Sequence, residues 1–169
     1  MTLLGAIRRA GRIAEAAPPR PDSPPSDACP VRIVSDRSLP LWGSVQVRHV
    51  DAGSSNDCEL ELAAAFGPVY DAERYGLRLV ASPRHADVLT VSGPVTRNMV
   101  EALVRTYEAL PAPKRVVALG DGAIDGGVFL GGHGVAGVVA DFLPVDIEVA
   151  GDPPSPADIV AALRLLTGR

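Results

Sequence analysis

The sequence lacks several of the features on which common classes of protein depend. It has only two cysteines, Cys29 and Cys58, which are too few for a disulfide framework or, by themselves, for a tetrahedral metal site or a four-thiolate cluster. No apolar stretch approaches the roughly 20 residues that span a bilayer. We see no secretory-signal pattern and expect none. The net charge is −4 and no basic run is present, so we expect no nucleic-acid partner.

The composition indicates one globular domain with an unusual first segment. The chain has 169 residues, of which 47% are hydrophobic and 21% are charged, and this suits a single soluble domain with a real core. The net charge of −4 is unevenly spread. Residues 1–40 contain six arginines, four acids and seven of the 16 prolines, so the acidic excess lies in the remainder.

The first segment divides into a predicted helix and a tether. Residues 1–17 predict a short amphipathic helix with Leu3, Leu4, Ile7 and Ile13 on one side and Arg8, Arg9 and Arg12 toward the other. Such a helix docks on a partner or an anionic membrane surface, or packs on its own domain. Residues 18–38 are predicted to be a Pro-rich tether. Residues 39–169 form the predicted main domain.

Strand patterns alternate with helix patterns along this domain. Strands are predicted at Val45–Val50, Leu77–Ala81, Val88–Ser92, Val116–Leu119 and Asp146–Val149, and helices at Cys58–Phe66, Thr96–Leu110 and Pro156–Leu166. This alternation predicts an α/β fold with a parallel sheet flanked by helices. Ligands in such folds bind at the carboxyl ends of the strands, so the turns after the strands are the places to examine.

Two of these turns carry suggestive but nonspecific patterns. The glycine-rich segment Asp121–Gly127 follows a strand, as an anion-binding turn would, but it matches neither nucleotide-binding fingerprint, and a tight turn is the favoured interpretation. Asp57 and Glu61 lie one helical turn apart. They indicate either a proton-exchanging pair of carboxylates or an ordinary acidic helix start that suits the helix dipole.

Four blocks of the sequence, taken in order, resemble one family. The blocks are His49–Leu62, Tyr70–Met99, Ala118–Phe129 and Pro144–Leu163, and the most specific piece is SPRHADVL followed by GPVT. They are similar to the iron–sulfur small subunit of energy-converting [NiFe] hydrogenases and to the matching subunit of respiratory complex I, the NADH-quinone oxidoreductase. The resemblance implies a flavodoxin-like fold. It also implies a peripheral place on the cytoplasmic face of the membrane, between a hydrogenase-like large subunit and the membrane-arm subunits.

The resemblance also implies where a [4Fe–4S] cluster would be bound, and three of those four positions are not cysteine. The family's four cysteine positions correspond to Ser55, Cys58, Gly122 and Asp152. A cluster needs thiolates, and Gly122 has no side chain at all. We therefore expect no bound cluster and no other metal, and the electron-transfer role of the family does not carry over.

Three functional interpretations remain open. In the first, the chain is a redox-silent structural subunit that is not catalytic by itself. In the second, it also supports proton or ion translocation through Asp57, Glu61 and His85, with Asp152. In the third, from another class, it is an electron-transferring oxidoreductase subunit whose iron–sulfur cluster is held by unconventional ligands. Iron content separates the third interpretation from the first two.

Overall fold

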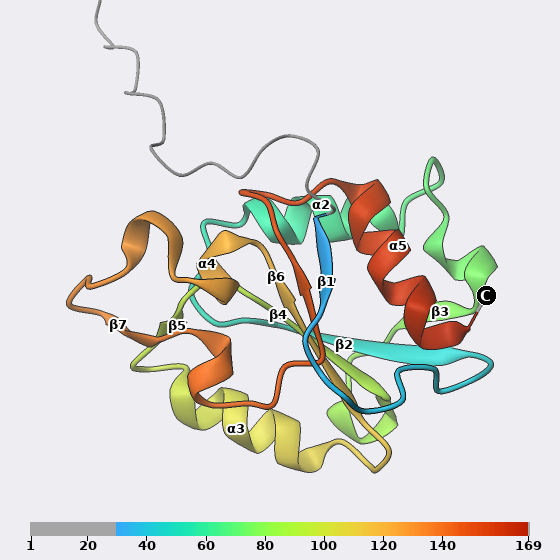
Figure 1. The fold of residues 1–169 in the computed structure, drawn as a ribbon, viewed down its shortest axis with the longest axis horizontal. Coiled ribbons are helices and arrows are strands. Elements are labelled where there is room, and N and C mark those ends of the chain that lie inside the picture. Colours follow the sequence, from blue (N-terminus) through green and yellow to red (C-terminus); the bar gives the residue numbers. More distant parts are fainter. Residues whose placement is uncertain (1–29, 169) are drawn as a thin grey trace, which may run out of the picture.

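The structure is a computed structural model that describes residues 30–168 (Figure 1). The predicted helix over 1–17 and the first part of the predicted tether lie outside these residues. The last part of the predicted tether contains regular structure, because Val31–Ile33 forms strand β1 of the main sheet. The domain therefore begins before Leu39, where the sequence pattern had placed its start.

Six strands form the central sheet in the order β1-β8-β6-β4-β2-β3. Besides β1 they are β2 (Val45–Asp51), β3 (Leu77–Leu79), β4 (Val88–Ser92), β6 (Arg115–Leu119) and β8 (Ile147–Val149). All neighbouring pairs are parallel except the edge pair β1 and β8. The five parallel strands follow the 2-1-3-4-5 order of flavodoxin-like folds, which confirms the predicted fold class.

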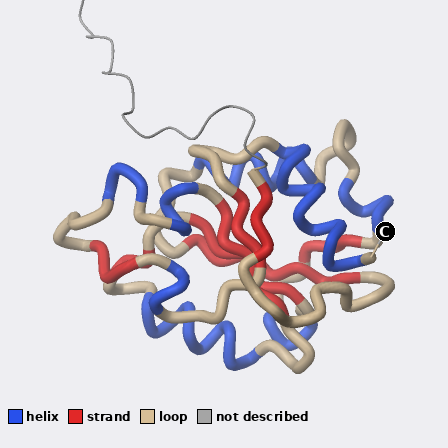
Figure 2. The backbone as a smooth tube through the Cα atoms, viewed as in Figure 1, coloured by secondary structure: helices blue, strands red, loops and turns tan. Residues whose placement is uncertain are grey.

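Helices cover both faces of the sheet (Figures 1 and 2). Helices α2 (Asp57–Ala65) and α5 (Pro156–Thr167) pack on one face, and α3 (Val100–Ala109) and the short α4 (Asp121–Ile124) lie on the other. Four 3-10 helices complete the connections: η1 (Ala72–Tyr75), η2 (Pro83–His85), η3 (Gly127–Phe129) and η4 (Val139–Asp141). Strand β4 is buried along its whole length, as its largely apolar sequence predicts.

Two strands that the sequence pattern did not indicate form a small separate ribbon. β5 (Val95–Thr96) pairs antiparallel with β7 (Val135–Gly137). The helix predicted from Thr96 therefore begins later, at Val100, because the Thr96 amide donates to the Ala52 carbonyl at 2.9 Å. No helix within residues 30–168 is long and apolar enough to cross a membrane.

Candidate functional site

The carboxyl ends of β2, β4, β6 and β8 bring four turns together. Between β2 and β4 the chain connections diverge to opposite sides, which is where ligands bind in open α/β sheets. The Ala52 amide donates to the Ser92 carbonyl at 3.0 Å, and the Asp121 amide donates to the Gly151 carbonyl at 2.9 Å. The turns after β2 and β4, and those after β6 and β8, are thus joined by backbone hydrogen bonds.

All four positions at which the resemblance places cluster cysteines line one small cavity between these turns. They are Ser55, Cys58, Gly122 and Asp152, and the other lining residues are Ser54, Asp57, Gly93, Pro94, Gly127, Val128 and Phe129. The space open to the centre of a water molecule is about 20 Å³, which is room for roughly one water. The structure therefore brings together residues from three separate parts of the sequence.

The residues around this cavity do not fit a [4Fe–4S] cluster held by four thiolates. Cys58 supplies the one thiol, which donates a hydrogen bond to the Leu119 carbonyl oxygen over 3.7 Å. Burial, together with the charges of Asp57 and Glu59, raises the pKa of this thiol to about 12. A Cβ added at Gly122 would lie 3.1 Å from Pro94 Cδ.

The two carboxylates at the cavity are in contact with each other. Asp57 interacts with Asp152 through its side chain, and it also accepts hydrogen bonds from the Cys58 amide and from Ser55. Burial by itself raises the pKa of Asp57, but the hydrogen bonds outweigh it and hold that pKa below its ordinary value. Asp57 is thus ionised at neutral pH. Within residues 30–168, no group of three His, Cys, Asp or Glu side chains is arranged to hold a metal ion.

The three residues predicted for a proton path are not all close together. Asp57 lines the cavity, and Glu61 lies one turn further along α2. His85 is exposed in η2, before β4 begins, whereas the cavity lies beyond the end of β4. The five residues of β4 separate the two ends by about 16 Å, so His85 belongs to the opposite edge of the sheet.

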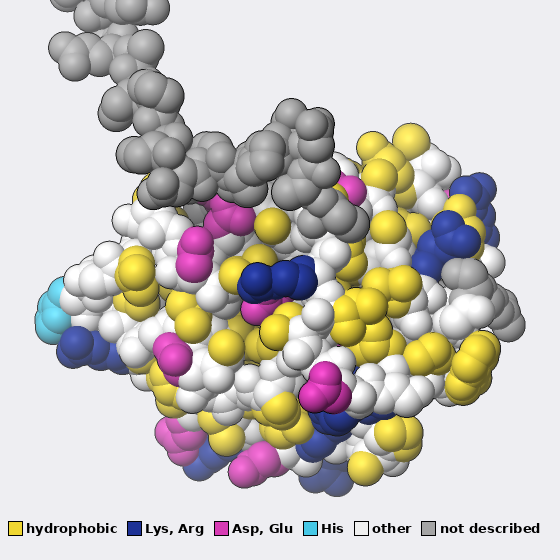
Figure 3. Space-filling model, in the orientation of Figure 1, with side chains coloured by type: hydrophobic (Ala, Val, Ile, Leu, Met, Phe, Trp, Pro, Cys, Tyr) yellow, Lys and Arg dark blue, Asp and Glu magenta, His cyan; other side chains and the backbone are white. Residues whose placement is uncertain are grey.

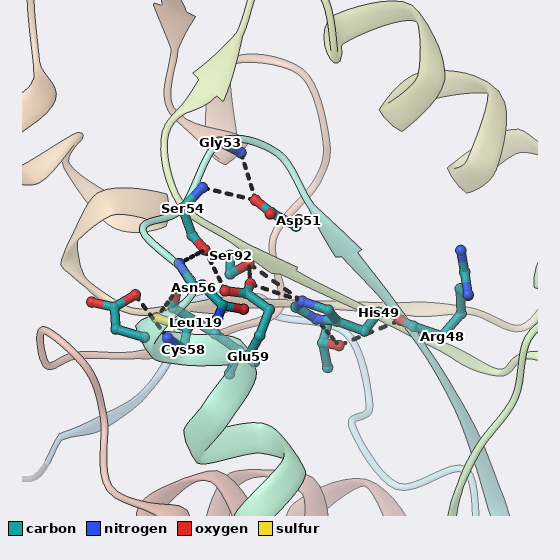
Figure 4. Close-up of polar contacts among 12 residues, drawn as sticks. Arg48, His49, Asp51, Gly53, Ser54, Asn56, Cys58, Glu59, Ser92 and Leu119 are labelled. Atoms are coloured by element: carbon teal, nitrogen blue, oxygen red, sulfur yellow. Dashed lines mark hydrogen bonds and ion pairs between the residues drawn. The ribbon is translucent and has the colours of Figure 1, made fainter.

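A hydrogen-bonded network next to the cavity was not predicted from the sequence (Figure 4). His49 Nε2 lies 3.1 Å from Glu59 Oε1, and His49 Nδ1 lies 3.0 Å from Thr90 Oγ1. Ser92 and Ser54 each donate a hydroxyl hydrogen bond to Glu59. Glu59 thus ties the turn after β2 and the start of α2 to strands β2 and β4.

The charge states of this network follow from burial and hydrogen bonding. Burial lowers the pKa of His49 despite the neighbouring Glu59 carboxylate. For Glu59, burial opposes ionisation, but hydrogen bonds from Ser54, Ser92 and His49 outweigh it and lower its pKa. At neutral pH a neutral imidazole therefore donates from Nε2 to an ionised carboxylate, which can only accept, and Nδ1 accepts from Thr90. The contact between His49 and Glu59 is a hydrogen bond rather than an ion pair.

One signal in the sequence could have indicated this network. Thr90 and Ser92 alternate on an otherwise apolar strand and are completely buried. Buried hydroxyl groups need hydrogen-bond partners, so two polar residues on one face of β4 predict a polar partner from a neighbouring strand. His49 lies directly opposite Thr90 in the register of β2 and β4.

The environment of Cys58 predicts slow chemical modification of its thiol. In a Cys29→Ser variant, which leaves Cys58 as the single cysteine, we expect iodoacetamide to react at neutral pH far more slowly with the folded protein than with the urea-unfolded protein. The reason is that the thiolate is the reactive form and the folded thiol has a pKa of about 12. Mass spectrometry of the alkylated protein measures both rates, and equal rates would contradict the buried, protonated thiol.

Comparisons with known proteins agree on one family. Residues 56–166 match the model of the family described as NADH ubiquinone oxidoreductase, 20 Kd subunit. A probable membrane-bound hydrogenase subunit of Pyrococcus furiosus is 46% identical over 119 residues, which cover 70% of this chain and 71% of that protein. Formate hydrogenlyase subunit 7 of Escherichia coli is 38% identical over 125 residues, or 74% of this chain and 49% of that protein.

A solved structure supports the same relationship. A chain in the structure of the membrane-bound sulfane sulfur reductase, an archaeal respiratory membrane complex, matches with a TM-score of 0.63 and 28% sequence identity. The match covers 72% of this chain and 68% of that chain. The similarity therefore extends over most of the α/β domain in both sequence and structure.

Proposed function

Because the chain belongs to the family of the 20 Kd subunit of NADH ubiquinone oxidoreductase, we propose that it is a redox-silent structural subunit of a membrane-bound assembly. The assembly is hydrogenase-related or complex I-like, in keeping with the names of the relatives. In it, the chain is a peripheral subunit on the cytoplasmic face and bridges a hydrogenase-like large subunit and the membrane arm.

The observation that carries this proposal is the chemistry of the cavity residues. Ser55, Gly122 and Asp152 stand at three of the four positions that the resemblance assigns to cluster ligands. One protonated thiol, one hydroxyl and two carboxylates are not the donors that iron–sulfur clusters use. A subunit without that cluster has no electron carrier at this position.

The chain's own hydrogen bonds help to hold the turns in place. Asp51 accepts from the backbone amides of Gly53 and Ser54, both at 2.8 Å, and Asp121 accepts from the Gly151 amide at 2.8 Å. Together with Glu59 these carboxylates fix the turns after three of the strands. The edge of the sheet thus keeps a defined shape for contact with partner subunits.

A second candidate function rests on the contact between Asp57 and Asp152. Two carboxylates in contact favour sharing a proton, so this pair, with Glu61 on the same helix, is a candidate for proton exchange in a translocating assembly. His85 is left out because it lies at the opposite edge of the sheet. Proton or ion flux in the assembly carrying Asp57→Asn separates this function from a purely structural one.

The proposal predicts that the native protein carries no stoichiometric iron or sulfide. The measurement is iron and sulfide analysis of the anaerobically purified assembly, together with low-temperature EPR. Because the large subunit and other partners can contain clusters, the isolated chain is analysed in parallel after treatment with iron and sulfide. A full cluster signal from this chain would overturn the proposal and favour an oxidoreductase subunit with an unconventionally held cluster.

A variant with restored ligands provides the positive control and a prediction of its own. We expect Ser55→Cys, Gly122→Cys and Asp152→Cys, combined with Asp57→Gly, to take up iron and sulfide and to show broad visible absorption, because all four positions already surround one cavity. The new Cβ at position 122 requires Pro94 to move by a few tenths of an ångström. If the restored variant folds and stays colourless, the cavity does not preserve the geometry of a cluster site.

A further inference from the structure

An exposed tryptophan lies at the edge of the sheet opposite to the cavity. Trp42 is the only tryptophan of the chain, and 73% of it is exposed. It precedes β2, whereas the cavity lies beyond the carboxyl end of that strand. Its backbone is in the left-handed region at φ 56°, which is rare for a bulky residue. Tryptophans that are half in an apolar and half in a wet environment are typical of contact surfaces.

The end of helix α5 holds Trp42 in this position. The amides on either side of Trp42 donate to the carbonyls of Leu166 and Thr167, at 2.8 and 3.5 Å. A Cβ added at Gly168 would lie 2.7 Å from the Trp42 ring, so the ring lies directly against this glycine. These contacts fix one side of the ring and leave the remainder of it in water.

Two arginines stack on one tyrosine beside the tryptophan. The guanidinium carbons of Arg74 and Arg164 lie 4.7 and 4.4 Å from the centre of the Tyr75 ring. Arg164 also accepts from the Gly168 amide through its carbonyl, at 3.1 Å, and its neighbour Leu165 is 39% exposed. We call these five residues the Trp42 surface: Trp42, Arg74, Tyr75, Arg164 and Leu165. Basic and hydrophobic side chains lie side by side at this end of the molecule, on the right in Figure 3.

The charge of the domain differs between the two edges of the sheet. The turns after β2, β4, β6 and β8 (residues 51–57, 93–94, 120–130 and 150–155) contain five aspartates and no Lys or Arg: Asp51, Asp57, Asp121, Asp125 and Asp152. The segments before β2, β3 and β4, with the last turn of α5 (residues 41–44, 71–76, 83–87 and 164–168), are balanced: Arg74, Arg84 and Arg164 against Asp71, Glu73 and Asp87. An anionic surface therefore repels the cavity edge and turns the Trp42 surface toward itself.

We propose that the Trp42 surface rests on the anionic headgroups of a lipid bilayer. Trp42 and Leu165 enter the boundary between headgroups and acyl chains, where an apolar ring with one polar N–H is well placed. Arg74 and Arg164 lie at the level of the phosphates and stay stacked on Tyr75, because a guanidinium keeps its charge when its face is covered. This inference rests on the proposed peripheral place at the membrane, but not on the absence of a cluster.

The fluorescence of Trp42 tests the contact, because no other tryptophan contributes. The full-length chain carries Arg8→Gln, Arg9→Gln and Arg12→Gln, which remove the basic charge of the predicted N-terminal helix. With vesicles of phosphatidylserine and phosphatidylcholine, we expect the emission to shift to shorter wavelength and to be quenched by lipids that carry a spin label near the headgroup. Vesicles of phosphatidylcholine alone and inorganic phosphate are expected to leave the emission unchanged.

Matched variants identify the surface that touches the lipid. A chain with Trp42→Phe and Val128→Trp has its single tryptophan beside the cavity, and we expect no quenching there. Arg74→Glu is expected to weaken vesicle binding roughly tenfold. Arg97→Glu changes the net charge equally at an exposed position after β5, and it is expected to leave binding unchanged. Circular dichroism shows whether each variant is folded.

Three outcomes in folded protein would overturn the proposal. They are an unchanged Trp42 emission with anionic vesicles, quenching of the tryptophan at position 128 instead, and equal effects of Arg74→Glu and Arg97→Glu. A Trp42 that is already shielded by a second copy of the chain before vesicles are added would show the first of these. Iron and sulfide analysis is independent of this assay, so failure of the lipid contact and failure of the redox-silent role are distinguishable.

Discussion

Replacing Val91 by aspartate is expected to lower the free energy of unfolding by about 4 kcal/mol or more. Val91 is 0% exposed and lies in β4, with β2 and β6 on its two sides. Its side chain packs in the core that contains Leu89 and Leu103. An aspartate there loses this apolar contact and buries a carboxylate without a partner. Because domains of this size are stable by roughly 5–15 kcal/mol, the variant approaches complete unfolding.

Urea denaturation followed by circular dichroism measures the effect, and two variants provide controls. Val91→Ala removes the same apolar contact without adding charge, and we expect a smaller loss of roughly 1–3 kcal/mol. Val69→Asp adds the same charge at a position that is 83% exposed, and it is expected to change stability by less than about 0.5 kcal/mol. If Val91→Asp unfolds at the parent's urea concentration, the burial of β4 is wrong.

Replacing Glu59 by alanine is expected to cost roughly 2–3 kcal/mol and to loosen the turn after β2. Glu59 accepts hydrogen bonds from Ser54, Ser92 and His49. Without it, the buried Ser92 hydroxyl and the His49 Nε2 hydrogen lose their acceptor. Urea denaturation measures the loss, and hydrogen exchange of the Ser54 and Cys58 amides measures the loosening.

Glu61→Ala is the matched control, because it removes the same side chain from the same helix two residues further on. Glu61 does not line the cavity and no hydrogen bond of its side chain contributes to the network. We expect its effect on stability to be small. Equal losses for the two variants would mean that the helix, and not the network, responds to the substitution.

The pKa directions in the network also predict how stability changes with pH. The pKa of His49 is lower in the folded state than its ordinary value of 6.5, so the unfolded chain binds a proton first as the pH falls. Stability due to the neutral ring is therefore present above pH 6.5 and is lost between there and the lower folded pKa. The pKa of Glu59 is lowered from 4.5, so its stabilising effect is present above pH 4.5 and disappears as the pH falls through its folded pKa.

Denaturation of the parent and of His49→Gln, at neutral pH and at about pH 5, tests the first part of this pH dependence. The parent is expected to lose stability between the two conditions. His49→Gln keeps a donor near Glu59 but has no proton to gain, so it is expected to lose less. If His49→Gln loses as much stability in acid as the parent, groups other than His49 cause the acid response.

The local sequence was sufficient to predict the elements with strong, uninterrupted patterns. Val88–Ser92 was predicted at the bounds that the structure shows, because an apolar run closed by Gly93-Pro94 specifies a buried strand and its end. The closing helix at Pro156 was predicted because Ile159, Ala162, Leu163 and Leu166 follow helical spacing. The structure adds that Ser155 caps this helix. The strands β1, β5 and β7 have two or three residues each and were missed. The equally short β3 and β8 lie inside the longer predicted runs Leu77–Ala81 and Asp146–Val149.

For the site as well, one part could be predicted from the sequence and another part only from the tertiary structure. The family motifs in the sequence predicted that Ser55, Cys58, Gly122 and Asp152 correspond to one site, and in the structure all four line one cavity. The tertiary structure alone placed His49 against Glu59 and Thr90, and it alone placed His85 at the far edge. The physical reason is that strand ends and helix caps depend on neighbouring residues. Contacts between residues on different strands, such as His49 and Thr90, which are 41 positions apart, instead depend on sheet order, strand direction and register.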